Sequence, residues 1–324
     1  MTADEYIQGI LSGNRTILAR AITLIESNAP RHAPLASEVV QAVLPHAGKS
    51  IRVGITGVPG VGKSTFIESL GMRLCSRGHR LAVLAVDPSS SLSRGSILGD
   101  KTRMELLSRE QDCFIRPSPA SGALGGVARK SRETILLCEA AGFDVILVET
   151  VGVGQSETTV RSMVDFFLVL MLAGAGDELQ GIKKGIIELA DALVITKADG
   201  ANRLPAEMAQ KEFSQVLHYL TPPNPAWHPK VLTCSSLEGK GVDAVWALIE
   251  SFQAQSAEDG FLTRQRQAQA LDWMREMLDQ ALWLNFSRHP DVHAEWETTC
   301  NAVLSGTLSP ATAVAQLLAN YHKP

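Results

Sequence analysis

The chain has 324 residues, of which 45% are hydrophobic and 20% are charged. This balance is typical of a globular protein and excludes a disordered, a collagen-like or a coiled-coil chain. The 30 basic and 34 acidic residues give a net charge of −4. We therefore expect no electrostatic binding to nucleic acid or to an anionic membrane.

The cysteines and the apolar segments indicate in which cellular compartment the protein is located. Five cysteines are scattered along the chain without a CxxC pair, which predicts neither a disulfide framework nor a zinc site. The first residues lack a basic segment followed by a long apolar one, and the most apolar run, residues 166–173, is too short to cross a bilayer. These features predict a cytoplasmic protein.

The order of apolar runs predicts the fold. Residues 1–50 are expected to form a helical extension, because apolar residues repeat at helical spacing on both sides of segment 30–34. From residue 51 onward, short β-branched runs alternate with longer amphipathic stretches; the runs are 51–56, 81–86, 113–116, 143–149, 166–172, 192–196 and 230–234. Continuous apolar runs indicate strands that are covered on both faces. We predict an α/β domain over residues 51–258, with a doubly wound, mostly parallel sheet.

Residues 259–324 show no further strand pattern. Leu271, Met274, Leu278 and Leu282 form an apolar stripe at helical spacing, with a tryptophan on either side of it. Such a stripe packs either on its own domain or against another copy of the chain. We predict a helical arm here, and the residues alone leave these alternatives open.

A phosphate-binding loop follows the first predicted strand. Residues 57–65 read GVPGVGKST and match the P-loop pattern, with a strand before them and a helical stretch after them. Glycines let successive backbone N–H groups turn toward an anion, and the N-terminus of the next helix adds partial positive charge. Lys63 would reach the terminal phosphates, and the Ser64 hydroxyl would hold Mg²⁺. The residues predicted to bind nucleotide here are Gly57, Val58, Pro59, Gly60, Val61, Gly62, Lys63, Ser64 and Thr65.

A second motif points to the base. Residues 196–199 read TKAD after a buried run, at the sheet edge where such folds bind ligands. In GTP-binding proteins, the corresponding NKxD segment reads guanine, and Lys197 and Asp199 occupy those positions, with Thr196 where Asn is usual. Three residues after the last strand are expected to back the base from the other side: Ser235, Ser236 and Leu237. We predict GTP rather than ATP.

Three carboxylates near strand ends are candidates for hydrolysis. Asp87, Asp100 and Glu149 would form a shell for Mg²⁺ and water that faces Lys63 and Ser64. Each acid alone could equally be a turn, a helix cap or a solvated strand end. Together they predict a magnesium site in which these acids and Lys63 are catalytic.

Several longer segments carry a family resemblance. They are GVPGVGKST at 57–65, AVDPSSSLSRGSILGDKTRM at 85–104, VILVETVGVGQSE at 145–157 and AGAGDELQGIKKGI at 173–186. With these segments the chain resembles the MeaB/ArgK branch, also called MMAA-like, of the SIMIBI-class P-loop GTPases. These proteins are GTPase chaperones of adenosylcobalamin-dependent methylmalonyl-CoA mutase.

The resemblance implies a homodimer with weak intrinsic GTPase activity that binds the mutase. Its nucleotide state would gate adenosylcobalamin loading and protect or reactivate the mutase. Segments 85–104 and 150–157 would act as switches, and Asp177, Gln180 and Lys183 would lie in a further switch that senses the partner. No Asp-x-His-x-x-Gly cobalamin signature occurs, so the cofactor is expected to belong to the partner.

Three other interpretations are weighed against this one. A P-loop would also serve a kinase or ATPase that phosphorylates a transport-linked or small-molecule acceptor. A nickel-insertion GTPase shares the P-loop, but the eight histidines are dispersed and only Cys234 lies near the nucleotide motifs. A scaffold that binds GTP and hardly hydrolyses it would look similar in the absence of a partner.

Overall fold

The structure is a computed structural model that describes residues 1–86, 104–117, 124–150, 156–174, 184–220, 222 and 224–322. The chain divides into two compact units, residues 1–267 and 268–324. Each unit is described here by itself.

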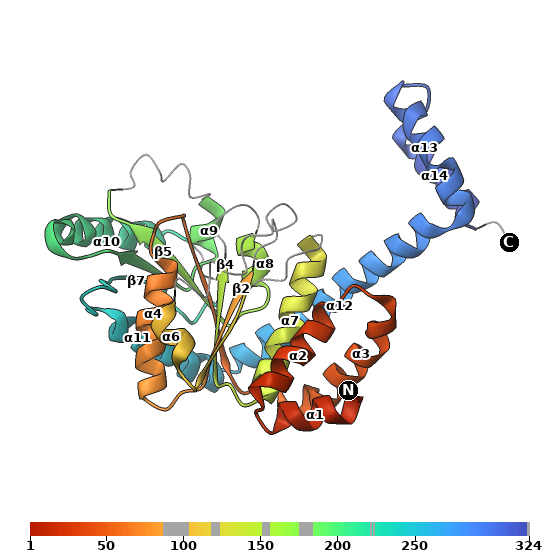
Figure 1. Ribbon diagram of the computed structural model, residues 1–324. Coiled ribbons are helices and arrows are strands. Elements are labelled where there is room, and N and C mark those ends of the chain that lie inside the picture. The colour runs from red at the N-terminus through yellow and green to blue at the C-terminus, as the bar shows by residue number, and fades with distance from the viewer. Residues whose placement is uncertain are drawn as a thin grey trace. The chain divides into compact units, whose positions relative to one another are not determined.

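The first unit is built on a parallel sheet (Figure 1). Seven strands in its described part pair in the order β3-β2-β4-β1-β5-β6-β7, and every pairing is parallel. The strands are β1 (Ile51–Gly57), β2 (Leu81–Val86), β3 (Cys113–Arg116), β4 (Val145–Thr150), β5 (Phe166–Leu172), β6 (Ala192–Thr196) and β7 (Lys230–Thr233). The predicted α/β sheet is therefore confirmed. Because β1 lies between β4 and β5, the loop after β1 is flanked by the carboxyl ends of both.

Helices cover both faces of the sheet, which explains the continuous apolar runs. In β5, for example, Phe166, Leu168 and Leu170 belong to one core, and the alternate residues belong to the other. The helices that connect and follow the strands are α4 (Lys63–Ser76), α6 (Glu105–Arg109), α7 (Leu124–Ala140), α8 (Ser156–Arg161), α9 (Lys184–Glu188), η4 (Gly200–Asn202), α10 (Arg203–His218) and α11 (Val242–Glu258).

The N-terminal residues form a small helical layer that packs on α7. Its elements are α1 (Ala3–Leu11), α2 (Arg15–Glu26), η1 (Pro30–His32), α3 (Ala33–Val43) and η2 (Leu44–His46). Thr2 begins α1 with a capping box, and the Asn14 side chain accepts hydrogen bonds from the first N–H groups of α2. Leu18, Ile22 and Ile25 of α2 are buried in the same core as α7. The layer is thus part of the first unit's core.

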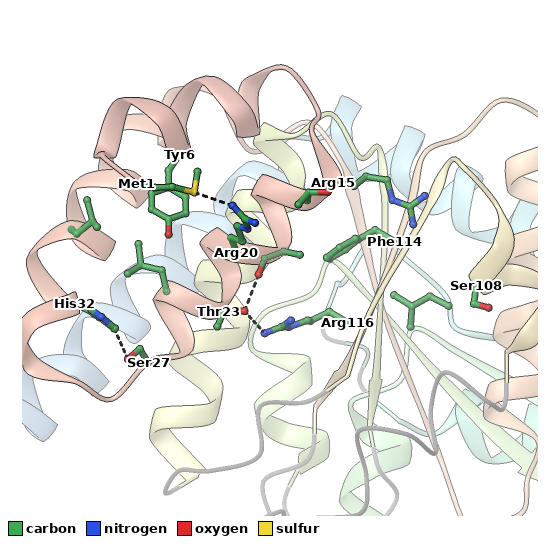
Figure 2. Close-up of a pocket in the computed structure, with 15 residues that line it drawn as sticks. Met1, Tyr6, Arg15, Arg20, Thr23, Ser27, His32, Ser108, Phe114 and Arg116 are labelled. Carbon is green, nitrogen blue, oxygen red and sulfur yellow. Dashed lines mark hydrogen bonds between the residues drawn. The ribbon is translucent and has the colours of Figure 1, made fainter.

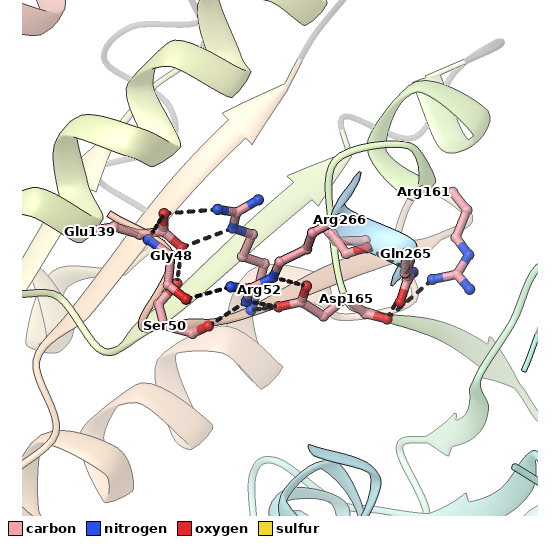
Figure 3. A network of polar contacts seen from close by, with 9 residues as sticks. Gly48, Ser50, Arg52, Glu139, Arg161, Asp165, Gln265 and Arg266 are labelled. Carbon is pink, nitrogen blue, oxygen red and sulfur yellow. Dashed lines mark hydrogen bonds and ion pairs between the residues drawn. The ribbon is translucent and has the colours of Figure 1, made fainter. Parts of the chain in front are cut away.

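Two buried ion pairs join elements of the first unit: one connects β1 with α7, and the other connects the first turns of α12 (Phe261–Arg288) with the residue before β5 (Figure 3). The Arg52 guanidinium donates to both carboxylate oxygens of Glu139, at 2.9 and 2.8 Å. Arg266 donates to both oxygens of Asp165, at 2.7 and 2.6 Å, and also to the carbonyl oxygens of Gly48 and Ser50. Neither the Glu139 nor the Asp165 side chain is exposed to solvent. Each carboxylate therefore depends on its arginine for charge compensation.

The second unit consists of the remainder of α12 together with α13 (Pro290–Leu304) and α14 (Pro310–Tyr321). The rings of Trp283 and Trp296 meet edge to face, with centroids 5.6 Å apart, and Phe286 lies 5.4 Å from Tyr321. No described residue of α12 is buried, and the side chains of the predicted apolar stripe are each more than half exposed. The stripe is thus not covered within the chain as described.

Candidate nucleotide-binding site

The phosphate loop needs glycine at three positions for two physical reasons. Gly57 ends β1 with φ of +152°, and a Cβ there would lie 2.5 Å from the Leu170 carbonyl oxygen. Gly60 and Gly62 have φ of +80° and +100°, where a side chain would meet nothing within 4 Å. At these two positions the backbone conformation itself requires glycine, while the space beside the loop stays open for a ligand.

Positive charge is concentrated at the start of α4. The helix begins at Lys63, and its cap residue Gly62 supplies no side-chain hydrogen bond to the first N–H groups. Lys63 Nζ donates to the carbonyl oxygen of Gly57 at 2.7 Å and to that of Val58 at 3.4 Å. The ammonium group therefore lies across the loop, beside a helix N-terminus that favours an anion.

The structure brings Ser64 and Glu149 together. Glu149 lies near the end of β4, and the register pairs it with Ile55 of β1. The Ser64 hydroxyl donates to Glu149 Oε1 at 3.3 Å, and Glu149 is buried. A hydroxyl and a carboxylate are the oxygen donors that Mg²⁺ prefers. One step further along both strands, Thr150 donates to Thr56 at 2.8 Å, which holds the two strand ends together.

Thr196 ties the end of β6 to the phosphate loop. Its buried hydroxyl lies 2.7 Å from the Val61 carbonyl oxygen and 3.2 Å from that of Met171. Sequence reasoning noted Thr196 only as a departure from the usual asparagine. The structure shows a role in positioning, since this hydroxyl bonds to the loop between the phosphate glycines.

Lys197 has a strained backbone. Its φ of +55° is the only positive value among described residues other than glycine, and such strain often accompanies functional sites. Asn202 Nδ2 donates to the Lys197 carbonyl oxygen at 2.7 Å, and the Ala198 N–H donates to the Cys234 carbonyl oxygen at 3.0 Å. These bonds fix the turn that carries the side chain of Lys197.

Asp199 and Ser235, both predicted to bind the base, contact each other. The Ser235 hydroxyl donates to Asp199 Oδ2 at 2.5 Å and accepts from the Glu238 N–H at 3.1 Å. Both residues line a cavity of about 510 Å³ at this edge. Leu237 is 83% exposed in the same loop, so its apolar side chain is free to cover a planar ligand. The segments of residues 196–199 and 234–237 therefore meet as the sequence predicts.

The comparisons with known proteins agree with this geometry. The sequence profile of the family described as "Methylmalonyl Co-A mutase-associated GTPase MeaB" matches residues 18–291. The chain belongs to the MeaB family. It is a GTPase by that membership, and the resemblance drawn from its motifs is confirmed.

Relatives of this MeaB-family protein cover nearly its whole length. "GTPase ArgK" of Escherichia coli (strain K12) is 47% identical over 316 residues, which are 98% of this chain and 96% of the relative. "Methylmalonic aciduria type A homolog, mitochondrial" of Mus musculus is 47% identical over 325 residues, which cover 97% of this chain and 78% of the relative. The structure called "Crystal structure of LAO/AO transport system kinase" is 40% identical, covers 99% of this chain and 98% of its own, and superposes with a TM-score of 0.80.

Some predicted site residues lie outside the described residues. They are Asp87, Asp100, Asp177, Gln180 and Lys183. Of the residues predicted to hold Mg²⁺, only Ser64 and Glu149 lie within the described part of the chain. Within the same described ranges, no helix is long and apolar enough to span a membrane.

Cys234 lies at the site, but its thiol is unreactive at neutral pH. Burial raises the pKa of its thiol to about 12, with an opposing hydrogen bond from Ser236. The group stays protonated at neutral pH, whereas a metal ligand or nucleophile must be a thiolate. In this MeaB-family protein, Cys234 therefore acts as a packed side chain behind the base-reading loop.

Proposed function

We propose that this chain binds GTP across the carboxyl edge of the sheet and hydrolyses it slowly, as a timed switch. The observation that carries the proposal is the pairing of Ser64 with Glu149 beside Lys63, on the edge where Ser235 also holds Asp199. At the phosphate end, the Lys63 ammonium and the helix N-terminus suit a phosphate. At the base end, the Asp199 carboxylate suits the N–H groups of guanine.

The described residues suit a magnesium ion in part. Ser64 and Glu149 supply a hydroxyl and a carboxylate in contact with each other. No group of three or more His, Cys, Asp or Glu among the described residues is arranged as a metal cluster. The Ser64–Glu149 pair suits Mg²⁺, which binds through one or two protein oxygens together with phosphates and water. We include Asp87 and Asp100 in this shell.

Each residue has a task in hydrolysis. Lys63 stabilises the negative charge that develops on the phosphate oxygens, and the loop N–H groups bind the same oxygens. Glu149 orients the Ser64 hydroxyl and accepts a hydrogen bond from a nearby water. Bound Mg²⁺ neutralises phosphate charge. Asp199 accepts hydrogen bonds from the N1–H and amino groups of guanine, while the Lys197 stem and Leu237 cover the two faces of the ring.

The cellular role rests on the family. We propose that the partner is adenosylcobalamin-dependent methylmalonyl-CoA mutase, because the matching profile is described as associated with that enzyme. The nucleotide state would gate cofactor loading and protect or reactivate the mutase. Asp177, Gln180 and Lys183 would sense the partner, and the scattered free cysteines support a cytoplasmic location.

We also propose that the chain forms a homodimer through α12. Leu271, Leu278 and Leu282 are each more than half exposed at helical spacing. A stripe of this kind is costly to leave in water, and a second copy presents the same stripe. The dimer would bury an apolar surface that the described chain leaves exposed.

Two alternatives differ in what happens to the γ-phosphate. Transfer to an acceptor is suggested by the kinase name of one structural relative. Nickel insertion finds less support, because Cys234 is buried and protonated. Under the switch proposal, water is the acceptor, and all the γ-phosphate is released as inorganic phosphate.

The deciding experiment is turnover of GTP labelled at the γ-phosphate by the full chain, with and without purified methylmalonyl-CoA mutase. We expect slow release of inorganic phosphate that the mutase stimulates severalfold. An unchanged rate with the mutase would contradict the partner. Label in an acceptor molecule would establish a kinase, and comparable affinity for ATP and GTP would contradict the guanine site.

A further inference from the structure

A second large cavity lies away from the nucleotide site (Figure 2). Its volume is about 1090 Å³, and it is bounded by α1, α2 and the start of α3 on one side and by α6 and the edge strand β3 on the other. None of the residues that line it belongs to the phosphate loop or to the base-reading segments. The cavity is large enough for a ligand of cofactor size.

Two arginines that form no ion pair with the described residues line this cavity. Arg15 Nη1 donates to the backbone carbonyl oxygens of Glu110 and Gln111, at 3.2 and 2.9 Å. These neutral acceptors hold the guanidinium in place and leave its charge intact. Arg20, five residues further along α2, makes its described hydrogen bond to the Met1 thioether sulfur at 3.7 Å, an acceptor that is weak and uncharged.

The third arginine differs from these two. Arg116 is paired with Glu26, and it also donates to the Thr23 hydroxyl at 3.3 Å. Its charge is therefore already compensated, and its side chain forms part of a structured wall. None of the fifteen described residues lining the cavity is acidic. Arg15 and Arg20 thus give the cavity a net positive potential that no lining carboxylate offsets.

The rest of the lining is apolar or neutral. Leu24 and Phe114 are buried, and Tyr6 and Leu35 are half-buried. His32 bonds through Nδ1 to the Ser27 hydroxyl at 2.8 Å, which leaves its other ring nitrogen to a ligand. An apolar floor with a few fixed polar groups is the usual construction of a small-molecule site, and the guanidinium fork matches carboxylate and phosphate geometry.

We propose that this cavity binds an organic anion, with a carboxylate or phosphate held by Arg20 and an apolar body against Leu24 and Phe114, while Arg15 adds positive potential to the same cavity. None of its described lining residues belongs to the phosphate loop, so we place this site apart from the nucleotide site. A small molecule suits it better than an acidic segment of a protein, since apolar side chains line the same cavity as the arginines.

Isothermal titration calorimetry of the full chain tests the proposal with two probes, 1-naphthyl phosphate and 1-naphthoate. We expect binding at one site that excess GDP does not displace and that Lys63→Ala does not weaken. The preferred probe tells phosphate from carboxylate. Arg20→Glu should weaken binding at least about tenfold, and Arg20→Lys, which keeps the charge but loses the fork, should weaken it less.

Arg31→Glu is the matched control, because Arg31 is exposed on η1, close in sequence to His32, and does not line the cavity. It should leave probe affinity unchanged, and both charge reversals should melt at the wild-type temperature. The proposal is overturned if neither probe binds, if Arg20→Glu binds as the wild type does, or if GDP displaces the probe. Binding of tetraglutamate without binding of the naphthyl probes would instead indicate a docking site for an acidic protein segment.

Discussion

The hydroxyl of Thr196 lies 2.7 Å from the carbonyl oxygen of Val61, 135 residues away in the sequence. This hydrogen bond joins the end of β6, which carries the base-reading segment, to the middle of the phosphate loop. Both groups are buried, so neither has water as a substitute partner. The two halves of the nucleotide site are therefore mechanically connected without any ligand.

Replacing Thr196 by valine should weaken nucleotide binding as well as stability. The shape is kept, but a buried carbonyl oxygen loses its partner at a cost of about 1–3 kcal/mol. Urea unfolding should show that loss, and titration with a fluorescent GDP analogue should show a raised Kd. Thr134→Val is the control, because it removes a buried hydroxyl hydrogen bond within α7, away from the nucleotide motifs. If both variants bind nucleotide equally well, Thr196 has only a structural role.

The Ser64–Glu149 contact predicts a separation of binding from turnover. Glu149→Gln keeps the size of the side chain but removes the charge that faces Ser64 and that would hold the proposed Mg²⁺. We expect GTP turnover to fall by about a hundredfold or more, because phosphoryl transfer depends on this positioning and charge, while GTP affinity changes little. Rates of phosphate release and equilibrium binding are measured side by side. Glu105→Gln, on the exposed face of α6, should change neither, and an unchanged rate in Glu149→Gln would remove Glu149 from the mechanism.

The Asp199–Ser235 pair predicts a switch in base preference. In Asp199→Asn the carboxylate acceptor becomes an amide, whose NH₂ group matches the 2-oxo group of xanthine instead of the 2-amino group of guanine. GTP affinity should fall at least about tenfold, since a buried donor of the base loses its partner, and XTP affinity should rise. Competition against a fluorescent GDP analogue measures both. Asp243→Asn is the control, because that exposed carboxylate pairs with Arg73 and Arg77 away from the base, and equal losses for GTP and XTP in Asp199→Asn would contradict base reading.

The lowered pKa of Glu139 predicts that the free energy of unfolding decreases as the pH falls. Burial alone would raise its pKa, but hydrogen bonds and charge from Arg52, with hydrogen bonds from Ser50 and Gly48, hold the pKa below its ordinary value of 4.5. A lowered pKa in the folded state means that the stabilisation is complete above the ordinary value and is lost as pH falls through the folded value.

Glu139→Gln should therefore cost about 3 kcal/mol in unfolding free energy at neutral pH, as expected for a broken buried pair. The difference from wild type should shrink steadily as the pH falls below the ordinary value of 4.5 and through the lowered pKa of the folded state. Urea unfolding across this range measures it. Glu238→Gln, which affects a solvent-exposed pair with Lys240, should show almost no difference at any pH. A constant gap between Glu139→Gln and wild type would mean that charge is not what the pair contributes.

The exposed stripe of α12 predicts the oligomeric state. Leu278→Glu places a charge in the middle of the stripe and should shift a dimer to a monomer in sedimentation velocity at micromolar concentration. Gln280→Glu is the control, because it lies two residues on and thus on the opposite side of the helix. A monomeric wild type, or a Leu278→Glu protein that remains dimeric, would contradict the proposed contact.

The strands, the phosphate loop and the TKAD segment at 196–199 could all be located from the amino-acid sequence, because they are local patterns. Apolar runs locate strands covered on both faces, and a glycine-rich turn before Lys63 and Ser64 has few uses other than binding phosphate. The predicted strand bounds needed only small changes; the run at 143–149, for instance, forms a strand over Val145–Thr150.

Which distant groups meet depends on how the strands and helices pack in the folded chain. The order of strands cannot be read from apolar runs, and it is this order that places Glu149 beside Ser64 and Thr196 beside Val61. The same holds for the N-terminal cavity, since Arg15 and Phe114 come together only when α2 packs against an edge strand. Side-chain contacts across a sheet depend on packing between segments far apart in the chain, for which a single sequence carries no periodic signal.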